Sequence, residues 1–244
     1  MLKLTALPLL VLPLFALADC KDQLDDWART VKPDLKFDRE RAACKINPAD
    51  GSQTLVALPF AENVTEDGDG DYGLAVIVAD TASNEVIALH YQTAFITSDA
   101  IRFDALTLDT ARYQLAPKLR AFGVRVAHRG SSRVNPYSSN SLNLYLLEGS
   151  TLRRVMTRLE VSAFGGEWDG MCVGELSQTE RTLFVTDKGR TSLASLQIDE
   201  KTVGTKNELK GDDCEGADTT VTSRTIIKYD QGHYAVPSGM SSIQ

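Results

Sequence analysis

The sequence predicts a mainly β protein, an antiparallel, hairpin-rich sandwich, barrel or propeller-like domain with one N-terminal helix. Three observations predict this fold class. After residue 51, apolar and polar residues alternate over short segments, as is typical of strands. Turn residues recur about every 8–12 positions between these segments. Helical spacing of apolar residues occurs close to the N-terminus.

Residues 1–18 have the pattern of a secretory signal. Lys3 is followed by an uncharged stretch from Leu4 to Ala18, which ends in Ala16-Leu17-Ala18. A positive start, an apolar centre and a small-x-small ending are what signal peptidase reads. The stretch is shorter than the ~20 residues that span a bilayer. We therefore expect a periplasmic or secreted protein with no membrane span after signal cleavage.

Residues 19–50 are expected to form a helical arm tied down by a disulfide. Its apolar residues follow the i, i+3, i+4, i+7 spacing of one buried helix face: Leu24, Trp27, Ala28 and Val31. Pro33 ends this helix, because proline cannot continue the hydrogen-bond ladder.

Four cysteines lie in the mature chain, and we expect the disulfides Cys20–Cys44 and Cys172–Cys214. An even number of cysteines in an exported chain is typical of a disulfide framework. Spacing permits three connectivities, and pairing the neighbours within each half is the preferred interpretation. No cysteine belongs to a CxxC motif, so neither zinc binding nor redox catalysis is predicted.

Residues 51–244 are expected to form one continuous β-rich domain. The predicted strands are Thr54–Leu58, Tyr72–Ala79, Asn84–Ile96, Phe103–Leu108, Phe122–His128, Leu142–Leu146, Leu152–Met156, Arg181–Thr186, Ser192–Ile198, Thr222–Tyr229 and His233–Val236. The predicted turns are Asp80 to Asn84, Glu148-Gly149-Ser150, Asp187-Lys188-Gly189 and Asp230-Gln231-Gly232.

The acidic loop Glu66 to Asp71 is a possible calcium site. Its alternating carboxylates are Asp67, Asp69 and Asp71. Glycines between them can bend a loop so that hard oxygens face one centre. A helix-loop-helix calcium motif fails, because Tyr72 and Val78 occupy the positions of its glycine and its closing glutamate. A β-type loop completed by Glu62 or Asp80 stays open, and so does a solvated acidic turn.

No residue is assigned a catalytic role. The chain has no nucleophile elbow and no phosphate-binding glycine loop, and its three histidines lie far apart in sequence. Glu167-Trp168-Asp169 suggests a paired-carboxylate glycan hydrolase, although the acids are only two positions apart between glycines. The alternative is a glycine-rich turn. We therefore expect a protein that is not an enzyme.

Two groups of residues are candidates for binding a partner. Arg125, Arg129 and Arg133 could form a basic stripe for an anionic partner, or could simply pair with surface acids. The loops Glu62–Asp71 and Gly130–Asn140 are the other candidates, because binding residues concentrate on loops. The predicted binding residues are Arg125, Arg129, Arg133, Tyr137, Glu167, Trp168 and Asp169.

Three segments carry a resemblance to a known group of proteins. They are Arg120–Val126, Ser131–Tyr137 and Gly165–Asp169, the last leading to Cys172. With these segments the chain resembles a group of uncharacterised exported proteins of Gram-negative bacteria. The resemblance implies a periplasmic address and no catalytic residues.

Charge and location together give a functional hypothesis. Without Lys3 the chain has 25 basic and 33 acidic residues, a net charge of −8, which disfavours nucleic acid as a partner. We expect a non-enzymatic binding or inhibitory protein whose partner is a protein or an envelope component, for example a basic lysozyme-like enzyme. The alternatives are a calcium-stabilised structural or adhesion module and an envelope glycan hydrolase.

Overall fold

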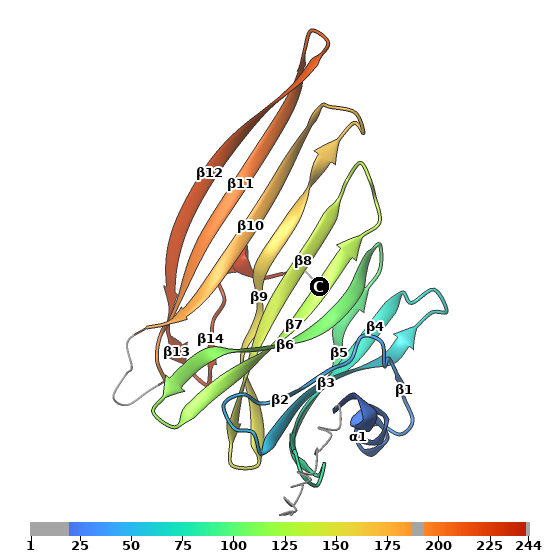
Figure 1. The fold of residues 1–244 in the computed structure, drawn as a ribbon, viewed down its shortest axis with the longest axis vertical. Helices are drawn as coiled ribbons and strands as arrows, with labels where there is room; N and C mark the ends of the chain where they lie inside the picture. Colours follow the sequence, from blue (N-terminus) through green and yellow to red (C-terminus); the bar gives the residue numbers. More distant parts are fainter. Residues whose placement is uncertain (1–19, 187–192, 243–244) are drawn as a thin grey trace, which may run out of the picture.

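The protein consists mostly of antiparallel β-structure with one N-terminal α-helix (Figure 1), which confirms the predicted fold class. The computed structural model describes residues 20–186 and 193–242. Two open sheets lie against each other, and neither closes on itself. The predicted signal 1–18 and the predicted turn Asp187-Lys188-Gly189 lie outside the described residues. Within the described ranges, no helix is long and apolar enough to cross a membrane.

The smaller sheet has five strands, and its two central strands are buried on both faces. Its strands are β1 (Lys36–Phe37), β2 (Ala43–Ile46), β3 (Gln53–Val64), β4 (Gly70–Asp80) and β5 (Val86–Ser98). β1 and β2 pair one after the other with the same edge of β3. The centres of β3 and β4 are continuous runs of buried residues, which is expected of strands covered on both sides.

The N-terminal helix covers the outer face of the small sheet. A 3₁₀ turn, η1 (Cys20–Gln23), leads into α1 (Leu24–Val31), which buries Leu24, Trp27 and Ala28 against β3 and β4. The Trp27 Nε1 group donates a hydrogen bond to the Asn84 main-chain oxygen at 2.8 Å. The disulfide Cys20–Cys44 joins η1 to β2. Both the helix and this cysteine pairing are confirmed.

The larger sheet is an antiparallel meander in chain order, with two short strands added. Its strands are β6 (Ile101–Ala116), β7 (Leu119–Gly130), β8 (Tyr137–Glu148), β9 (Thr151–Trp168), β10 (Gly174–Val185), β11 (Leu196–Lys210), β12 (Asp213–Ile227), β13 (Tyr229–Asp230) and β14 (His233–Tyr234). β14 pairs with β9, and the 3₁₀ turn η2 (Ser238–Met240) follows it.

The large sheet reaches far beyond the small one (Figure 1). We call this outer part, residues 160–182 and 199–225, the sheet extension. Here the predicted strands Ser192–Ile198 and Thr222–Tyr229 were wrong in extent, because β11 continues to Lys210 and β12 begins at Asp213. Threonine and charged residues lie on both faces of these segments, so they carry no apolar alternation. Their main-chain ladder, unbroken from Leu196↔Ile227 to Lys210↔Asp213, holds them together.

Apolar side chains fill both faces of the lower part of the large sheet. One core lies between the two sheets and includes Leu74, Val76, Phe103, Val124 and Tyr145. A second core, on the opposite face of the large sheet, includes Leu115, Leu144, Leu159, Ile198 and Tyr234. The predicted alternation on β7 is confirmed, since Phe122, Val124 and Val126 face the core between the sheets.

A buried asparagine holds a bulge in β9. Asn143 is fully buried, and its side-chain oxygen accepts the main-chain N–H of Arg158 at 2.8 Å. Its amide group donates to the Val124 main-chain oxygen at 3.4 Å. Arg158 lies in the left-handed region with φ of 56°, where the pairing of β8 with β9 shifts register. The bulge directs Arg158 toward β5, where its Nη2 donates to the Phe95 main-chain oxygen at 2.9 Å.

Positive charge and histidine lie together between the sheets. The guanidinium carbons of Arg154 and Arg158 lie 4.8 and 5.0 Å from the centre of the Phe95 ring. Burial and the charge of Arg154 lower the pKa of His90, which is half-buried on β5. Burial also lowers the pKa of His128, on β7, although its Nε2 lies 3.1 Å from the Thr97 main-chain oxygen. The fold therefore favours the neutral form of both histidines.

Replacing Asn143 should destabilise the protein. Asn143→Leu keeps the branched shape of the side chain but removes the acceptor of the Arg158 N–H, and a buried donor without its acceptor costs about 1–3 kcal/mol. Denaturant unfolding should show a loss of this size in the free energy of unfolding. Asn63→Ala, at an exposed position on β3, is the matched control and should change it little. Equal stabilities of the two variants would contradict the assigned role of Asn143.

Mild acid should also destabilise the fold. Below about pH 6.5 the histidines of the unfolded chain bind protons that His90 and His128 in the folded chain resist, so the free energy of unfolding falls. Above that pH both states carry neutral imidazoles, and the histidines have no effect. Comparing denaturant unfolding at pH 7.5 and 5.5 should show the loss. Carboxyl groups with a lowered pKa, such as that of Asp109, lose their contribution only at lower pH.

Histidine variants separate this effect from others. His90→Gln and His128→Gln should each reduce the loss of stability between pH 7.5 and 5.5. His233→Gln, at an exposed position on β14, is the control and should keep the full loss. If neither interior variant reduced the loss, the histidines would not be its cause.

Candidate functional site

Two neighbouring loops meet at the far end of the large sheet. They are the β7–β8 loop, residues 131–136, and the β9–β10 loop, residues 169–173. The Trp168 main-chain N–H donates to the Val134 main-chain oxygen at 2.9 Å, and the Trp168 Nε1 group donates to that of Arg133. The loops of the β7–β8 and β9–β10 hairpins lie at the same end of the sheet, so residues far apart in sequence become neighbours there.

The β9–β10 loop is held at both ends. The carboxylate of Asp169 accepts the main-chain N–H groups of Met171 and Cys172 at 2.9 and 2.8 Å. The Asp169 N–H donates to the Val173 oxygen at 2.8 Å. These main-chain donors lower the pKa of Asp169. The disulfide Cys172–Cys214, as predicted, joins the loop to β12. The loop is therefore a braced turn, and the Asp169 carboxylate is its cap.

This braced turn exposes apolar side chains. Met171 is 88% exposed, Val134 47%, Val173 43% and Trp168 36%. With Glu167 and Glu175 these residues form what we call the tip surface: Val134, Glu167, Trp168, Met171, Val173 and Glu175. All of them except Met171 line a shallow depression of about 460 Å³. Large apolar side chains gathered on rigid loops are a feature of interaction sites.

The tip surface is acidic beside its apolar residues. Glu167 on β9 lies directly opposite Glu175 on β10. Like charges directly opposite each other on paired strands repel and cost stability. Lys206 on β11 compensates in part, with its Nζ 3.7 Å from the Glu175 carboxylate, but it lies closer to Glu208, at 2.8 Å. A positive group from a partner would therefore find a favourable position beside Glu167 and Glu175.

The structure brings together five of the seven predicted binding residues. Arg133 lies in the β7–β8 loop, Tyr137 begins β8 opposite Gly165, and Glu167, Trp168 and Asp169 end β9 or follow it. Sequence reasoning missed Met171, Val173 and Glu175. The signal that could have revealed the first two is the run Asp169-Gly170-Met171-Cys172-Val173, in which apolar residues flank a disulfide cysteine within a glycine-containing turn.

The other two predicted residues, Arg125 and Arg129, pair with acids on β6. Arg125 Nη2 lies 2.7 Å from an Asp109 carboxylate oxygen, and its Nε donates to the same oxygen at 2.9 Å. Burial raises the pKa of Asp109, but the Ala111 N–H and the Arg125 guanidinium outweigh it and lower the pKa. Arg129 lies 3.2 Å from Asp104. The structure thus supports the alternative in which these arginines pair with acids.

The acidic loop predicted as a calcium site contacts Arg102 on β6 and Thr97 on β5. Arg102 Nη1 donates to the Asp67 main-chain oxygen at 2.6 Å, and its Nη2 lies 3.6 Å from the Asp69 carboxylate. Asp71 accepts the Thr97 hydroxyl at 2.9 Å. Among the residues that the structure describes, no three His, Cys, Asp or Glu side chains are grouped as a metal site would need. Calcium binding by this loop stays a prediction.

The two acids suggested to complete a calcium shell have other partners. Glu62 accepts the Tyr91 hydroxyl and, at 2.7 Å, the Ala94 main-chain N–H. Asp80 accepts the main-chain N–H groups of Ala82 and Ser83 at 3.0 and 2.8 Å and so caps the β4–β5 turn.

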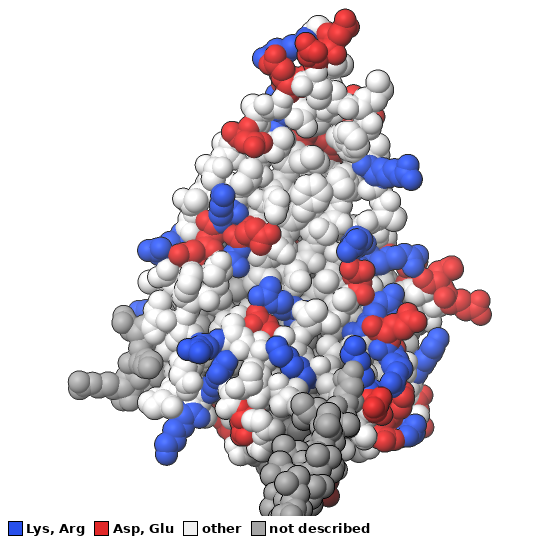
Figure 2. All heavy atoms as spheres, viewed as in Figure 1, with Lys and Arg blue, Asp and Glu red and all other residues white. Residues whose placement is uncertain are grey.

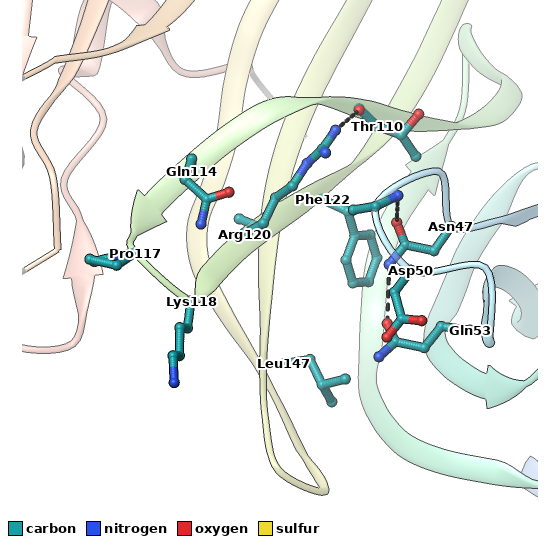
Figure 3. A pocket seen from close by; sticks show the side chains of 12 residues that line it. Asn47, Asp50, Gln53, Thr110, Gln114, Pro117, Lys118, Arg120, Phe122 and Leu147 are labelled. Atoms are coloured by element: carbon teal, nitrogen blue, oxygen red, sulfur yellow. Dashed lines mark hydrogen bonds between the residues drawn. The ribbon is translucent and has the colours of Figure 1, made fainter.

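A second hollow, of about 390 Å³, lies between the β6–β7 hairpin, the β2–β3 turn and the end of β8 (Figure 3). Phe122 and Leu147 supply its apolar lining. Its polar side chains bond mainly to the protein itself. Arg120 Nη2 donates to the Thr110 main-chain oxygen at 2.7 Å, and Asn47 donates to the Gln53 side chain at 3.1 Å. This hollow therefore has the character of a solvated cleft, and the tip surface is the stronger candidate for a functional site.

Comparison with known proteins adds no assignment to this geometry. No protein-family model, no curated protein and no solved structure matches the chain.

Proposed function

We propose that the protein is a non-enzymatic binding or inhibitory protein of the periplasm or the cell exterior, and that the tip surface is its binding face. The observation that carries this proposal is the exposure of Trp168, Met171 and Val173 on a turn braced by Asp169 and by the Cys172–Cys214 disulfide.

A braced apolar turn is suited to binding for an energetic reason. Association costs free energy when loops and side chains become ordered, and a loop that is already fixed avoids much of this cost. Tryptophan is among the residues that dominate binding energy at interfaces. Methionine is flexible and polarisable, so it adapts to an apolar cavity on a partner. Trp168 and Met171 together therefore offer a fixed anchor and an adaptable one.

The charge of the site indicates a basic partner. Glu167 and Glu175 lie beside the apolar residues, and the whole mature chain has a net charge of −8. Complementary charge speeds association and favours basic partners over acidic ones. A basic, lysozyme-like envelope enzyme has this property, and a rigid turn that covers its substrate cleft would inhibit it. We propose such an enzyme as the specific target.

Two features favour binding over glycan hydrolysis. The carboxylate of Asp169 caps two main-chain N–H groups, which keeps it ionised and engaged in the turn. The Trp168 indole N–H donates to the Arg133 main-chain oxygen, which braces the ring against the neighbouring loop. Asp169, one of the two acids of the predicted carboxylate pair, thus has a structural role in the turn, and Trp168 between the two acids joins the two loops.

Disrupting the apolar part of the tip surface should abolish inhibition. The mature protein should inhibit a basic lysozyme in a lytic assay on peptidoglycan, at close to equimolar amounts. Met171→Asp should weaken binding at least ~30-fold, the equivalent of a hot-spot loss of about 2 kcal/mol. Leu89→Asp, at a position on the small sheet that is 41% exposed, is the matched control and should retain inhibition. Equal activity of these two variants would contradict the proposed binding face.

The acidic part of the tip surface should set the salt dependence. Glu175→Lys should slow association with a basic partner, and the affinity of the unmodified protein should fall as salt rises. Surface plasmon resonance would measure both effects.

A photo-crosslinking residue tests the binding face without assuming the target. When this residue replaces Met171 and the protein is exported by its host cell, one discrete crosslinked product should form. The same residue in place of Leu89 should not give that product, and Glu175→Lys should lower its yield. An adduct pattern shared by both positions would count against the tip surface. A specific adduct without lysozyme inhibition would retain the binding function and reject the lysozyme-like target.

A further inference from the structure

The outer edge of β12 is the one long sheet edge with no partner in the described part of the chain. The outer edge of β3 pairs with β1 and β2. Main-chain oxygens at the edge of β5 accept Arg158 or lie against His128. The edge of β6 bonds to Arg41 and Ala194. By contrast, every residue from Asp213 to Arg224 on β12 is exposed.

β12 also lacks several of the features by which proteins protect an edge strand, although it has four charged residues, Asp213, Glu215, Asp218 and Arg224. Such edges usually contain charged residues, above all lysine, or proline or a bulge, or they are short. β12 is 15 residues long, its sequence has no lysine and no proline, and its pairing with β11 has no register shift. Its central part, Thr219-Thr220-Val221-Thr222, is β-branched throughout, which favours strand pairing. A long edge without lysine, proline or a bulge is a template for another strand, and its charges decide which strand fits it.

The turn between β11 and β12 fixes which main-chain groups face outward. Lys210 and Asp213 flank the two-residue turn Gly211-Asp212, in which Gly211 has φ of +67°. In such a hairpin the flanking residues form a hydrogen-bonded pair. Odd-numbered residues of β12 therefore direct their main-chain groups toward β11. Even-numbered residues, from Gly216 to Ile226, direct theirs to the free edge.

We propose that a second copy of this protein occupies the free edge, with the two β12 strands antiparallel and Val221 on the two-fold axis. In this register the even-numbered residues pair with one another and exchange main-chain hydrogen bonds. Residue numbers of paired positions then sum to 442, so Asp218 of one copy lies directly opposite Arg224 of the other. If the register is shifted by two residues in either direction, the even-numbered residues still pair with one another, but a threonine or isoleucine then lies opposite Asp218.

The charged pair selects this register. Asp218 and Arg224 lie on the same face of β12. The contact between Asp218 of one copy and Arg224 of the other would therefore form twice, once on each side of the two-fold axis. Arg224 uses its Nε and Nη2 groups for Asp199 on β11, at 2.8 and 3.0 Å. A guanidinium has further N–H donors that can reach a second carboxylate. On the other face, Val221 would meet Val221 of the second copy, a β-branched pair that favours strand association.

A cysteine pair tests the register directly. The two residues on the axis form a non-hydrogen-bonded pair with Cα atoms about 4.5 Å apart, within the range of a disulfide. Val221→Cys should therefore give a covalent dimer on mild oxidation, seen on a non-reducing gel. Thr219→Cys is the matched control, on the same strand and the same face. In this register the two residues at position 219 lie about 14 Å apart, so this variant should remain uncrosslinked.

Charge variants test the partner. The unmodified mature protein should reach twice the monomer mass in sedimentation experiments at rising concentration. Asp218→Arg and Arg224→Asp should each be monomeric, because each places like charges opposite each other. A mixture of the two should recover the double mass, since both opposing pairs are then complementary. Circular dichroism would verify that each variant is folded.

Three outcomes would overturn the proposal. They are a protein that stays monomeric at all concentrations, equal crosslinking at positions 219 and 221, or a mixture of charge variants that remains monomeric. If β12 instead bound a strand of another protein, the purified protein would stay monomeric at all concentrations, which is the first of these outcomes. None of the four β12 variants changes a residue of the tip surface, so failure here leaves the proposed binding function intact.

Discussion

The burial of β3 and β4 on both faces of the small sheet is the constraint on which the rest of the structure depends. β3 and β4 are continuous apolar runs at their centres, so each face needs an apolar cover. α1 supplies one cover, and the large sheet supplies the other. The small sheet has three long strands, of 11 to 13 residues, and two short ones, whereas the large sheet has seven strands, β6 to β12, of 12 to 18 residues. The remainder of the large sheet therefore projects as the extension.

The extension needs a different kind of stabilisation from the core. Its residues on β10 to β12 are mostly exposed or half-buried, and charged side chains gather at the far end of the β11–β12 hairpin and around the lower half of the molecule (Figure 2). The main-chain ladder and the Cys172–Cys214 disulfide hold it. Cys20–Cys44 acts in the same way on α1, where one short helix covers a sheet face. In the chain-entropy account, loops of 24 and 42 residues correspond to about 3–4 kcal/mol each.

Features that depend on apolar pattern were predictable from sequence, and features that depend on main-chain pairing were not. The stripe of Leu24, Trp27 and Ala28 predicts α1, and the alternation from Phe122 to Val126 predicts the inward face of β7. The segments 199–210 and 213–221 carry no such alternation. They are strands because their neighbours extend beside them, and pattern within the segments alone does not reveal this.

The candidate site divides in the same way. Trp168 and its acidic neighbours stand out by residue type, so sequence reasoning found them. Glu175 is significant only because β9 and β10 pair so that it faces Glu167, and this depends on register. Arg125 and Arg129 seemed available for a partner in the sequence, but Asp109 and Asp104 on the neighbouring strand β6 neutralise them. In a sheet, the cross-strand neighbour decides whether a charge is available, and that neighbour is far away in sequence.

The two proposed contacts use different parts of the extension, and neither obstructs the other. The tip surface lies at the end of β9 and β10, whereas the β12 edge runs along the side of the sheet. Pairing through β12 would join main-chain groups in line with the existing ladder and would cover neither face of the sheet. Because the paired strands run antiparallel, the two tip surfaces would point in opposite directions. A dimer of this kind would thus carry two separate binding faces at its two ends, each held by its own disulfide.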